Sequence, residues 1–240
     1  SYLYRGVAYR DKGEYARAIK DLDQAVALNP DSDMTYHNRG KAYAAQGDYD
    51  HAMADFDKAI ALNEKEWSTY YDRGKLYFSR GQRKLAKKDF TQAIELNPHF
   101  VPAYNRRGLI YGLEGDYTKA IKDFGQAIAL DPKYVSAYLN QGWLRFVQQK
   151  HAEAISDFSK VQKLEPENLY AHILLFLARE HSGKDGKAEL TTFLKTLEGN
   201  GFKVSLVRMF LGEITPEQCL AAAVDENPQR DKEKKCEAYY

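Results

Sequence analysis

The chain has 240 residues, of which 44% are hydrophobic, 13% aromatic and 29% charged, with a formal net charge of +1. This composition is typical of a folded globular protein and excludes an intrinsically disordered chain. No apolar run approaches the roughly 18 residues that a membrane-spanning helix needs, and the 35 basic residues barely exceed the 34 acidic ones. We therefore expect no transmembrane segment and no nucleic-acid partner.

Residues that carry redox or metal chemistry are sparse. The two cysteines, Cys219 and Cys236, are too few for a disulfide framework and lack the spacing of a zinc site. The six histidines are scattered and form no metal-binding motif. We expect buried structural thiols, no metal, no cofactor and no catalytic residues. The compartment stays open between periplasm and cytoplasm.

Glycine recurs at a strict spacing of 34 residues, which makes the first part of the chain an array of repeats. The repeated glycines are Gly6, Gly40, Gly74, Gly108 and Gly142. Within each unit the apolar residues fall three and four apart, which predicts two amphipathic helices per unit. A turn glycine such as Gly47 separates the two helices. The expected units are 1–32, 33–66, 67–100, 101–134 and 135–168.

The repeated glycine predicts a close contact between the two helices of a unit, because a missing Cβ lets the second helix approach. Small and aromatic residues follow in the same register, as in Ala52 and Phe56. An isolated hairpin of this length does not bury its apolar face, so the five units are expected to stack on one another.

These repeats resemble the tetratricopeptide repeat, whose pattern places tyrosine, glycine, alanine, phenylalanine and proline at these offsets. In unit 33–66, for example, they are Tyr36, Gly40, Ala52 and Phe56. The resemblance covers residues 1–166 and implies an all-α, right-handed superhelical α-solenoid. It also implies a scaffold for protein–protein interaction.

Residues 167–240 are expected to form a degenerate helical repeat that caps the array. Two helices are predicted within 169–198, with Ala188 at the small position, and another within 203–212. A fourth is predicted after Thr215, with Pro216 at the first helical position and Gln218 completing a capping box. A last helix is expected to be cut off at the chain end, and both termini suggest a fragment of a longer protein.

The C-terminal stretches LVRMFLGEITPEQCLAAA and CEAYY also resemble a bacterial outer-membrane lipoprotein family with tetratricopeptide repeats. That family serves as an adaptor for peptidoglycan hydrolases and a protease. The resemblance implies a homodimeric periplasmic adaptor.

An arginine precedes the repeated glycine in four units, and an aspartate follows sixteen residues later on the second helix. Two interpretations are open: a row of arginines facing an acidic ligand, or an Arg–Asp ladder that joins helix to helix. We favour the ladder because the aspartates repeat as faithfully as the arginines. Its members are Arg39, Arg73 and Arg107 with Asp55, Asp89 and Asp123. Gln141 breaks the series, so Asp157 needs another donor.

The partner-binding surface is expected on the first helix of each unit, at positions that point away from the paired helix. In a stack of repeats these positions line an inner groove. The predicted groove residues are Asn38, Lys41, Tyr71, Lys75, Phe78, Asn105, Arg106, Leu109, Asn140 and Trp143. His37 and Asp72 fall at the same positions. Aromatic anchors beside basic groups favour a peptide or partner domain with acidic side chains.

Tetratricopeptide proteins that act as chaperone adaptors hold a terminal carboxylate with a fixed set of lysines, asparagines and an arginine. Here His37 and Pro102 stand where that pattern has lysine. The mismatch disfavours an acidic chaperone tail as ligand. The alternative function is self-association, in which the groove or the C-terminal helices form a homodimer contact.

Overall fold

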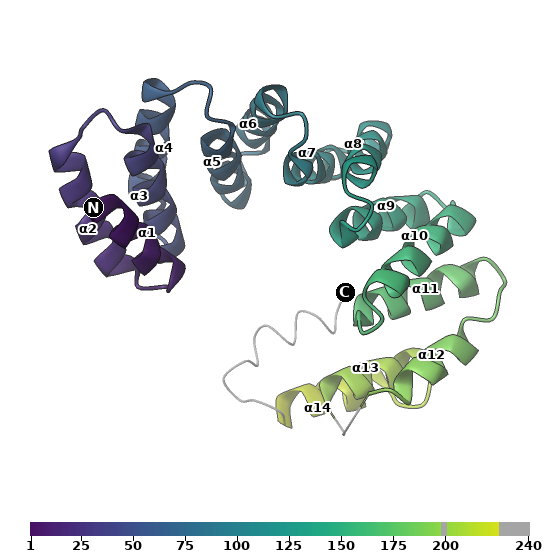
Figure 1. The fold of residues 1–240 in the computed structure, drawn as a ribbon. Helices are drawn as coiled ribbons and strands as arrows, with labels where there is room; N and C mark the ends of the chain where they lie inside the picture. Colours follow the sequence, from purple (N-terminus) through teal and green to yellow (C-terminus); the bar gives the residue numbers. More distant parts are fainter. Residues whose placement is uncertain (198–200, 226–240) are drawn as a thin grey trace. The chain divides into compact units, whose positions relative to one another are not determined.

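The computed structural model describes residues 1–197 and 201–225, and all regular structure in these residues is α-helical (Figure 1). The helices are α1 (Tyr2–Asp11), α2 (Tyr15–Leu28), α3 (Asp33–Gln46), α4 (Tyr49–Leu62), α5 (Trp67–Ser79), α6 (Arg83–Leu96), α7 (Val101–Leu113), α8 (Tyr117–Leu130), α9 (Val135–Val147), α10 (His151–Leu164), α11 (Leu169–His181), α12 (Lys187–Leu194), α13 (Phe202–Leu211) and α14 (Pro216–Asp225). Within this part of the chain, no helix combines the length and apolarity needed to cross a membrane.

The chain divides into two compact units, Ser1–Asp131 and Pro132–Tyr240. The first unit contains four hairpins, which pair α1 with α2, α3 with α4, α5 with α6 and α7 with α8. Between successive hairpins of this unit, α2 packs on α3, α4 on α5 and α6 on α7. In the second unit α9 pairs with α10, and α11 to α14 follow as successive neighbours. The predicted all-α fold of stacked helix pairs is confirmed.

The two helices of a hairpin touch most closely at the repeated glycine. A Cβ built on Gly74 would lie 2.8 Å from Cε1 of Phe90, whose side chain is completely buried. In the second unit a Cβ on Gly142 would lie 2.7 Å from Cε1 of Phe158. Any larger residue would push the helices apart, so the glycine spacing sets the hairpin geometry.

In the second, third and fourth repeats, one arginine joins three helices. Arg39 donates from Nε and Nη2 to the two carboxylate oxygens of Asp55, each at 2.8 Å, within its own hairpin. Its Nη1 donates at 2.8 Å to Asp23, which belongs to the preceding hairpin. Arg73 repeats the arrangement with Asp89 and Asp57, and Arg107 repeats it with Asp123 and the hydroxyl of Thr91. The arginines are therefore bonded inside the stack, both within and between hairpins.

The fifth repeat builds this contact differently. With Gln141 in place of arginine, Asp157 accepts a hydrogen bond at 2.7 Å from Nη1 of Arg145, one turn further along α9. Burial raises the pKa of Asp157 to about 6, and the charge and hydrogen bond of Arg145 only partly oppose it. The single bond from Arg145 to one carboxylate oxygen thus does not offset the burial of Asp157.

In the C-terminal helices, the large and the small residue of the hairpin contact have changed places. Phe176 occupies the position of the repeated glycine on α11, and the close neighbour is now Gly186, where a Cβ would lie 2.9 Å from Phe176 Cδ2. The expected small position is wrong: Ala188 is exposed, and α12 buries Leu190 and Phe193 instead. The short α12 begins only at Lys187, so a different face of the helix turns inward.

The predicted capping box at the start of α14 is confirmed. Gln218 donates its backbone N–H to Oγ1 of Thr215 at 3.3 Å, and Oε1 of Gln218 accepts from the Thr215 backbone at 2.9 Å. Cys219 on the same helix is completely buried, and burial raises the pKa of its thiol. Cys236 and the expected last helix lie outside the described residues.

Replacing Arg73 by glutamine should lower the free energy of unfolding by about 3 kcal/mol, because the 3% exposed Asp89 is left as a buried charge without its partner. The matched control Asp57→Asn removes only the contact to the preceding hairpin. The side chain of Asp57 is 54% exposed, so this change should cost about 1 kcal/mol or less. Urea unfolding followed by circular dichroism measures both. Equal costs would contradict the assignment of Asp89 as the dominant partner.

The carboxyl group of Asp157 should titrate with a midpoint near 6 in an NMR experiment on the folded protein. Because this pKa is raised above the value in the unfolded chain, folding favours the protonated form, and stability is lost as pH rises from about 4 through 6. The double change Gln141→Arg, Arg145→Tyr restores the fork of the other repeats and should bring the midpoint below about 4. An unchanged midpoint would show that the fork does not control this carboxyl.

Candidate functional site

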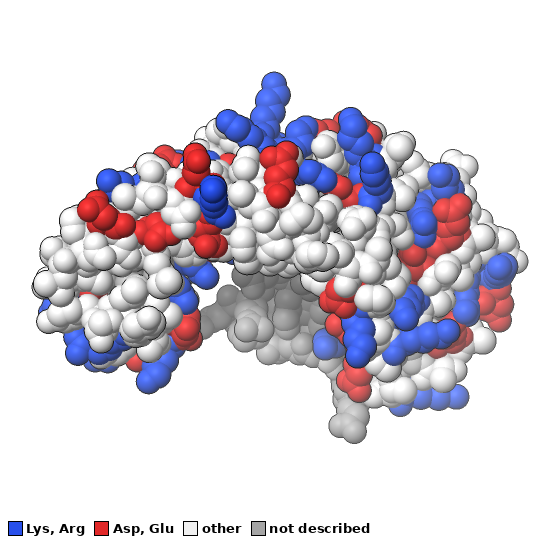
Figure 2. Space-filling model, turned by 45° about the horizontal axis from the view of Figure 1, so that its top comes forward, with Lys and Arg blue, Asp and Glu red and all other residues white. Residues whose placement is uncertain are grey.

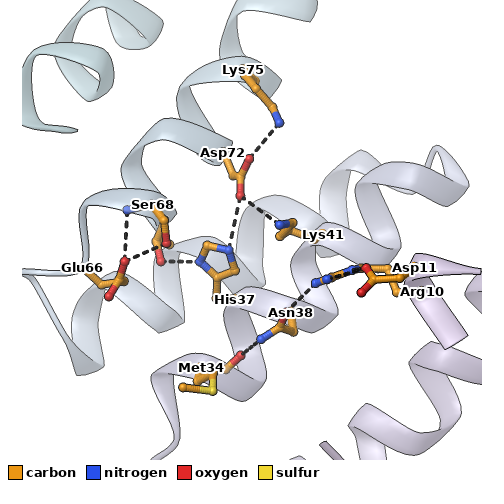
Figure 3. A network of polar contacts seen from close by, with 11 residues as sticks. Arg10, Asp11, Met34, His37, Asn38, Lys41, Glu66, Ser68, Asp72 and Lys75 are labelled. Carbon is orange, nitrogen blue, oxygen red and sulfur yellow. Dashed lines mark hydrogen bonds and ion pairs between the residues drawn. The ribbon is translucent and has the colours of Figure 1, made fainter. Parts of the chain in front are cut away.

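The first helices α1, α3 and α5 share one face, because α1 packs beside α3 and α3 beside α5. A polar network lies on this face, and Asp72 on α5 is at its centre (Figure 3). One oxygen of Asp72 lies 2.8 Å from Nζ of Lys75. The other lies 3.2 Å from Nε2 of His37 and 3.8 Å from Nζ of Lys41. Two consecutive repeats thus contribute three nitrogens around one carboxylate.

His37 connects this carboxylate to the interior. Its Nδ1 lies 2.6 Å from the hydroxyl of Thr69, and both residues are buried. The neutral ring with the proton on Nε2 satisfies both contacts, since Thr69 then donates to Nδ1 and Nε2 donates to Asp72. A hydroxyl, an imidazole and a carboxylate in series are also the parts of a nucleophile triad. Thr69 is only 1% exposed, so its hydroxyl is out of reach of a substrate and the series has a structural role.

The charges around Asp72 outweigh the cost of burying it. Burial alone raises the pKa of this carboxyl, but the hydrogen bond from His37 and the charges of Lys75 and Lys41 lower it to about 2. Asp72 is therefore ionised at all ordinary pH values. It holds the two lysine ammonium groups, whose side chains are 38% and 46% exposed, at the surface of the shared face.

Arg10 on α1 forms a second group of polar contacts, which joins the first repeat to the second (Figure 3). Its Nη1 donates to Oδ1 of Asn38, while Nε and Nη2 donate to Asp11 at 3.1 and 2.7 Å. Asn38 in turn donates to the backbone carbonyl of Met34 at 2.7 Å. The amide of Asn38, predicted to contact a ligand, thus holds Arg10 against α3.

The predicted aromatic residues of the first unit line the same face but are half-buried. Tyr71 packs edge-on against Phe100 with ring centroids 4.8 Å apart, and Phe78 packs beside the buried Phe90 and Ile110. Arg106 and Leu109 on α7 are also half-buried. Each of these residues therefore leaves part of its surface exposed and uses the rest in packing.

The structure corrects the expectation that every first-helix position pointing away from the paired helix lines an open groove. His37, Asp72 and Asn105 are buried, with exposed fractions of 8%, 9% and 5%. The helical wheel predicts only which face turns away from the paired helix. For His37 and Asp72, the neighbouring hairpin covers that face.

In the second unit, the predicted anchor Trp143 on α9 is 47% exposed and stacks on Phe146 with centroids 5.8 Å apart. Asn140 is half-buried on the same helix. The visible face of the molecule in Figure 2 carries acidic and basic side chains interspersed, without a large area of one sign.

Sequence reasoning missed the role of Arg10 and the placement of Asp72 between two lysines. A signal was present for the lysines, because Lys41 and Lys75 occupy the same position in consecutive units and Asp72 precedes Lys75 by three residues, which is one helical turn. The contact of Arg10 with Asn38 spans 28 residues and depends on how one hairpin lies against the next.

Replacing Asp72 by asparagine should lower the free energy of unfolding by about 2 kcal/mol near neutral pH. The pKa of Asp72 is depressed on folding, so its stabilisation is present above about pH 4 and is lost as pH falls toward 2. Urea unfolding at about pH 5 and about pH 2 should show the gap between wild type and Asp72→Asn closing at the lower value. A gap that stays constant would mean that ionisation of Asp72 contributes nothing.

Comparison with known proteins agrees with this architecture. A family model described as "TPR repeat" matches residues 6–47. Two models described as "Tetratricopeptide repeat" match residues 34–66, 67–100 and 101–134, and residues 136–168. Among curated proteins, no relative matches the chain.

Several solved structures are similar to the model. MamA is 26% identical with a TM-score of 0.62, over 68% of this chain and 95% of that one. YrrB, described as a TPR protein with an unusual peptide-binding site, is 24% identical with a TM-score of 0.60, over 71% and 88%. The C-terminal part of a TPR protein from Cytophaga hutchinsonii is 17% identical with a TM-score of 0.76, over 96% and 97%. Because the family models together span more than half of the sequence, the chain belongs to the tetratricopeptide-repeat family.

Proposed function

We propose that this chain is a non-catalytic scaffold that binds a peptide segment or a partner domain on the first helices of its repeats. Membership in the tetratricopeptide-repeat family supports a role in protein interaction generally. The observation that carries the finer proposal is the face shared by α1, α3 and α5, where exposed ammonium groups lie beside half-buried aromatic rings. Such a mixture suits a polypeptide, which offers both apolar and charged side chains.

The predicted residues divide into two roles under this proposal. Leu109 on α7 and Tyr71 and Phe78 on α5 supply apolar contact in the first unit, and Trp143 supplies it in the second. Lys41, Lys75 and Arg106 supply positive charge, while Asn140 offers a side-chain amide to the backbone of a peptide. Preformed surfaces of this kind bind short peptides with affinities around −8 kcal/mol, in the micromolar range.

Self-association is a second candidate, because several large apolar side chains are exposed. Tyr4 on α1 is 72% exposed, Leu28 on α2 75%, and Trp143 and Val147 on α9 47% each. Apolar side chains at these positions suit burial against a second copy of the chain.

Selection from a library of random dodecapeptides displayed on phage tests the scaffold proposal. Peptides that bind the wild-type chain should bind about tenfold more weakly to Leu109→Ala or to Trp143→Ala, because each change removes an apolar contact. Leu85→Ala is the matched control, since Leu85 is 45% exposed but lies on the second helix α6. An empty selection, or an equal loss in the control, would overturn the proposal.

Light scattering over a roughly hundredfold concentration range separates the two candidates. The scaffold proposal expects a constant mass near 27.5 kDa for the wild type and for the double variant Leu109→Ala, Trp143→Ala. A dimer in the wild type that dissociates in the double variant would put self-association first.

A further inference from the structure

A pocket opens on the shared face of the first unit between the first and third repeats. Its volume is about 360 Å³. The cationic residues that line it are Arg10, Lys41 and Lys75, and the remaining lining residues are Tyr15, Ala44, Ala45, Phe56 and Asp72. Five helices, α1 to α5, contribute to it. The pocket is thus assembled by stacking and is absent from any single hairpin.

The space exists because the second repeat has small residues at two positions where its neighbours have larger ones. Ala44 and Ala45 stand at the positions that Phe78 and Ser79 occupy in the third repeat. In the first repeat, Arg10 and Asp11 fill these positions. The two alanines and the buried Phe56 therefore give the pocket an apolar part of its lining besides the three cations.

The polar groups at the pocket still have capacity to donate hydrogen bonds. An ammonium group has three N–H donors, and Asp72 is the acidic partner that Lys41 and Lys75 share. Lys41 lies 3.8 Å from that carboxylate, beyond hydrogen-bond distance, so its donors stay available. A guanidinium group has five donors, and the contacts of Arg10 with Asp11 and Asn38 use three of them.

The charges favour an anionic occupant. Arg10, Lys41 and Lys75 contribute three positive charges, whereas Asp11 and Asp72 contribute two negative ones, which leaves a net charge of about +1. Asp72 lines the pocket but is nine-tenths buried and contacts His37 and the two lysines, so the ammonium groups are more exposed than the carboxylate. A basic side chain entering the pocket would meet these cations first.

We propose that this pocket binds the side-chain carboxylate of a glutamate or aspartate within a bound peptide. The carboxylate accepts hydrogen bonds from Lys41, Lys75 and Arg10, and its methylene groups lie on Ala44, Ala45 and the ring of Phe56. Asp72 fixes the two ammonium groups before the ligand arrives, so less side-chain entropy is lost on binding. The inference rests on the proposed scaffold function and names the chemistry of one residue of its ligand.

Fluorescence anisotropy with labelled hexapeptides tests this assignment. Hexaglutamate amide should bind the wild-type chain at least tenfold more tightly than hexaglutamine amide, and the difference should shrink as salt is added. In the double variant Lys41→Gln, Lys75→Gln the preference should disappear. Lys84→Gln, an exposed lysine on α6, is the matched control and should keep it. Thermal unfolding by circular dichroism verifies that the variants are folded.

Three results would overturn the inference. One is equal binding of the two amides to the wild type, and another is an equal loss in Lys84→Gln, which would indicate unspecific attraction. The third is tight binding of hexaglutamine with a free C-terminus, which would assign the pocket to a chain end instead of a side chain.

The peptides selected from the phage library separate this inference from the scaffold proposal. If the double lysine variant binds them as well as the wild type does, the scaffold proposal stands and the pocket assignment fails. If the library yields no binder, the scaffold proposal itself fails.

Discussion

The fork between an arginine and an aspartate sixteen residues later is the interaction on which the first unit depends. Each guanidinium of Arg39, Arg73 and Arg107 makes two hydrogen bonds inside its own hairpin. Its Nη1 donates a third hydrogen bond to the preceding hairpin. Buried ion pairs are poor sources of net stability, because desolvation offsets much of the attraction. Their geometry is demanding, however, and a slip of one residue would leave a buried carboxylate without a donor. The forks therefore fix the register of the two helices within each hairpin, and the third bond links that hairpin to the one before it.

A fixed register is what allows surface chemistry to be assembled from separate repeats. Lys41 and Lys75 meet the same carboxylate only because α3 and α5 lie at a defined height against each other. The repeated residues, among them Gly74 and Phe90, keep the hairpins alike. Ala44 and Asp72 are residues that the other repeats do not share. They give the place where α3 meets α5 a pocket and a charge.

The sequence predicts the hairpins well because their determinants are local and periodic. The contact of Gly74 with Phe90 and the capping box of Thr215 with Gln218 each follow from spacing along one or two helices. The burial of His37 and Asp72 does not, because it depends on the angle at which the two neighbouring hairpins pack on each other. The prediction for Ala188 fails for a related reason: Ala188 stands at the small position of the degenerate repeat, but α12 starts late and turns another face inward.

The third bond of each arginine also determines which repeats are chemically interchangeable. Unit 33–66 carries both a donor for the hairpin before it, Arg39, and an acceptor for the hairpin after it, Asp57. Tandem copies of this unit would satisfy one another at every step. Unit 101–134 carries the donor Arg107, but Gly125 stands at the acceptor position. Gene duplication or deliberate extension of the array is thus compatible with copies of repeat 33–66. Copies of repeat 101–134 would lack this link at each new junction.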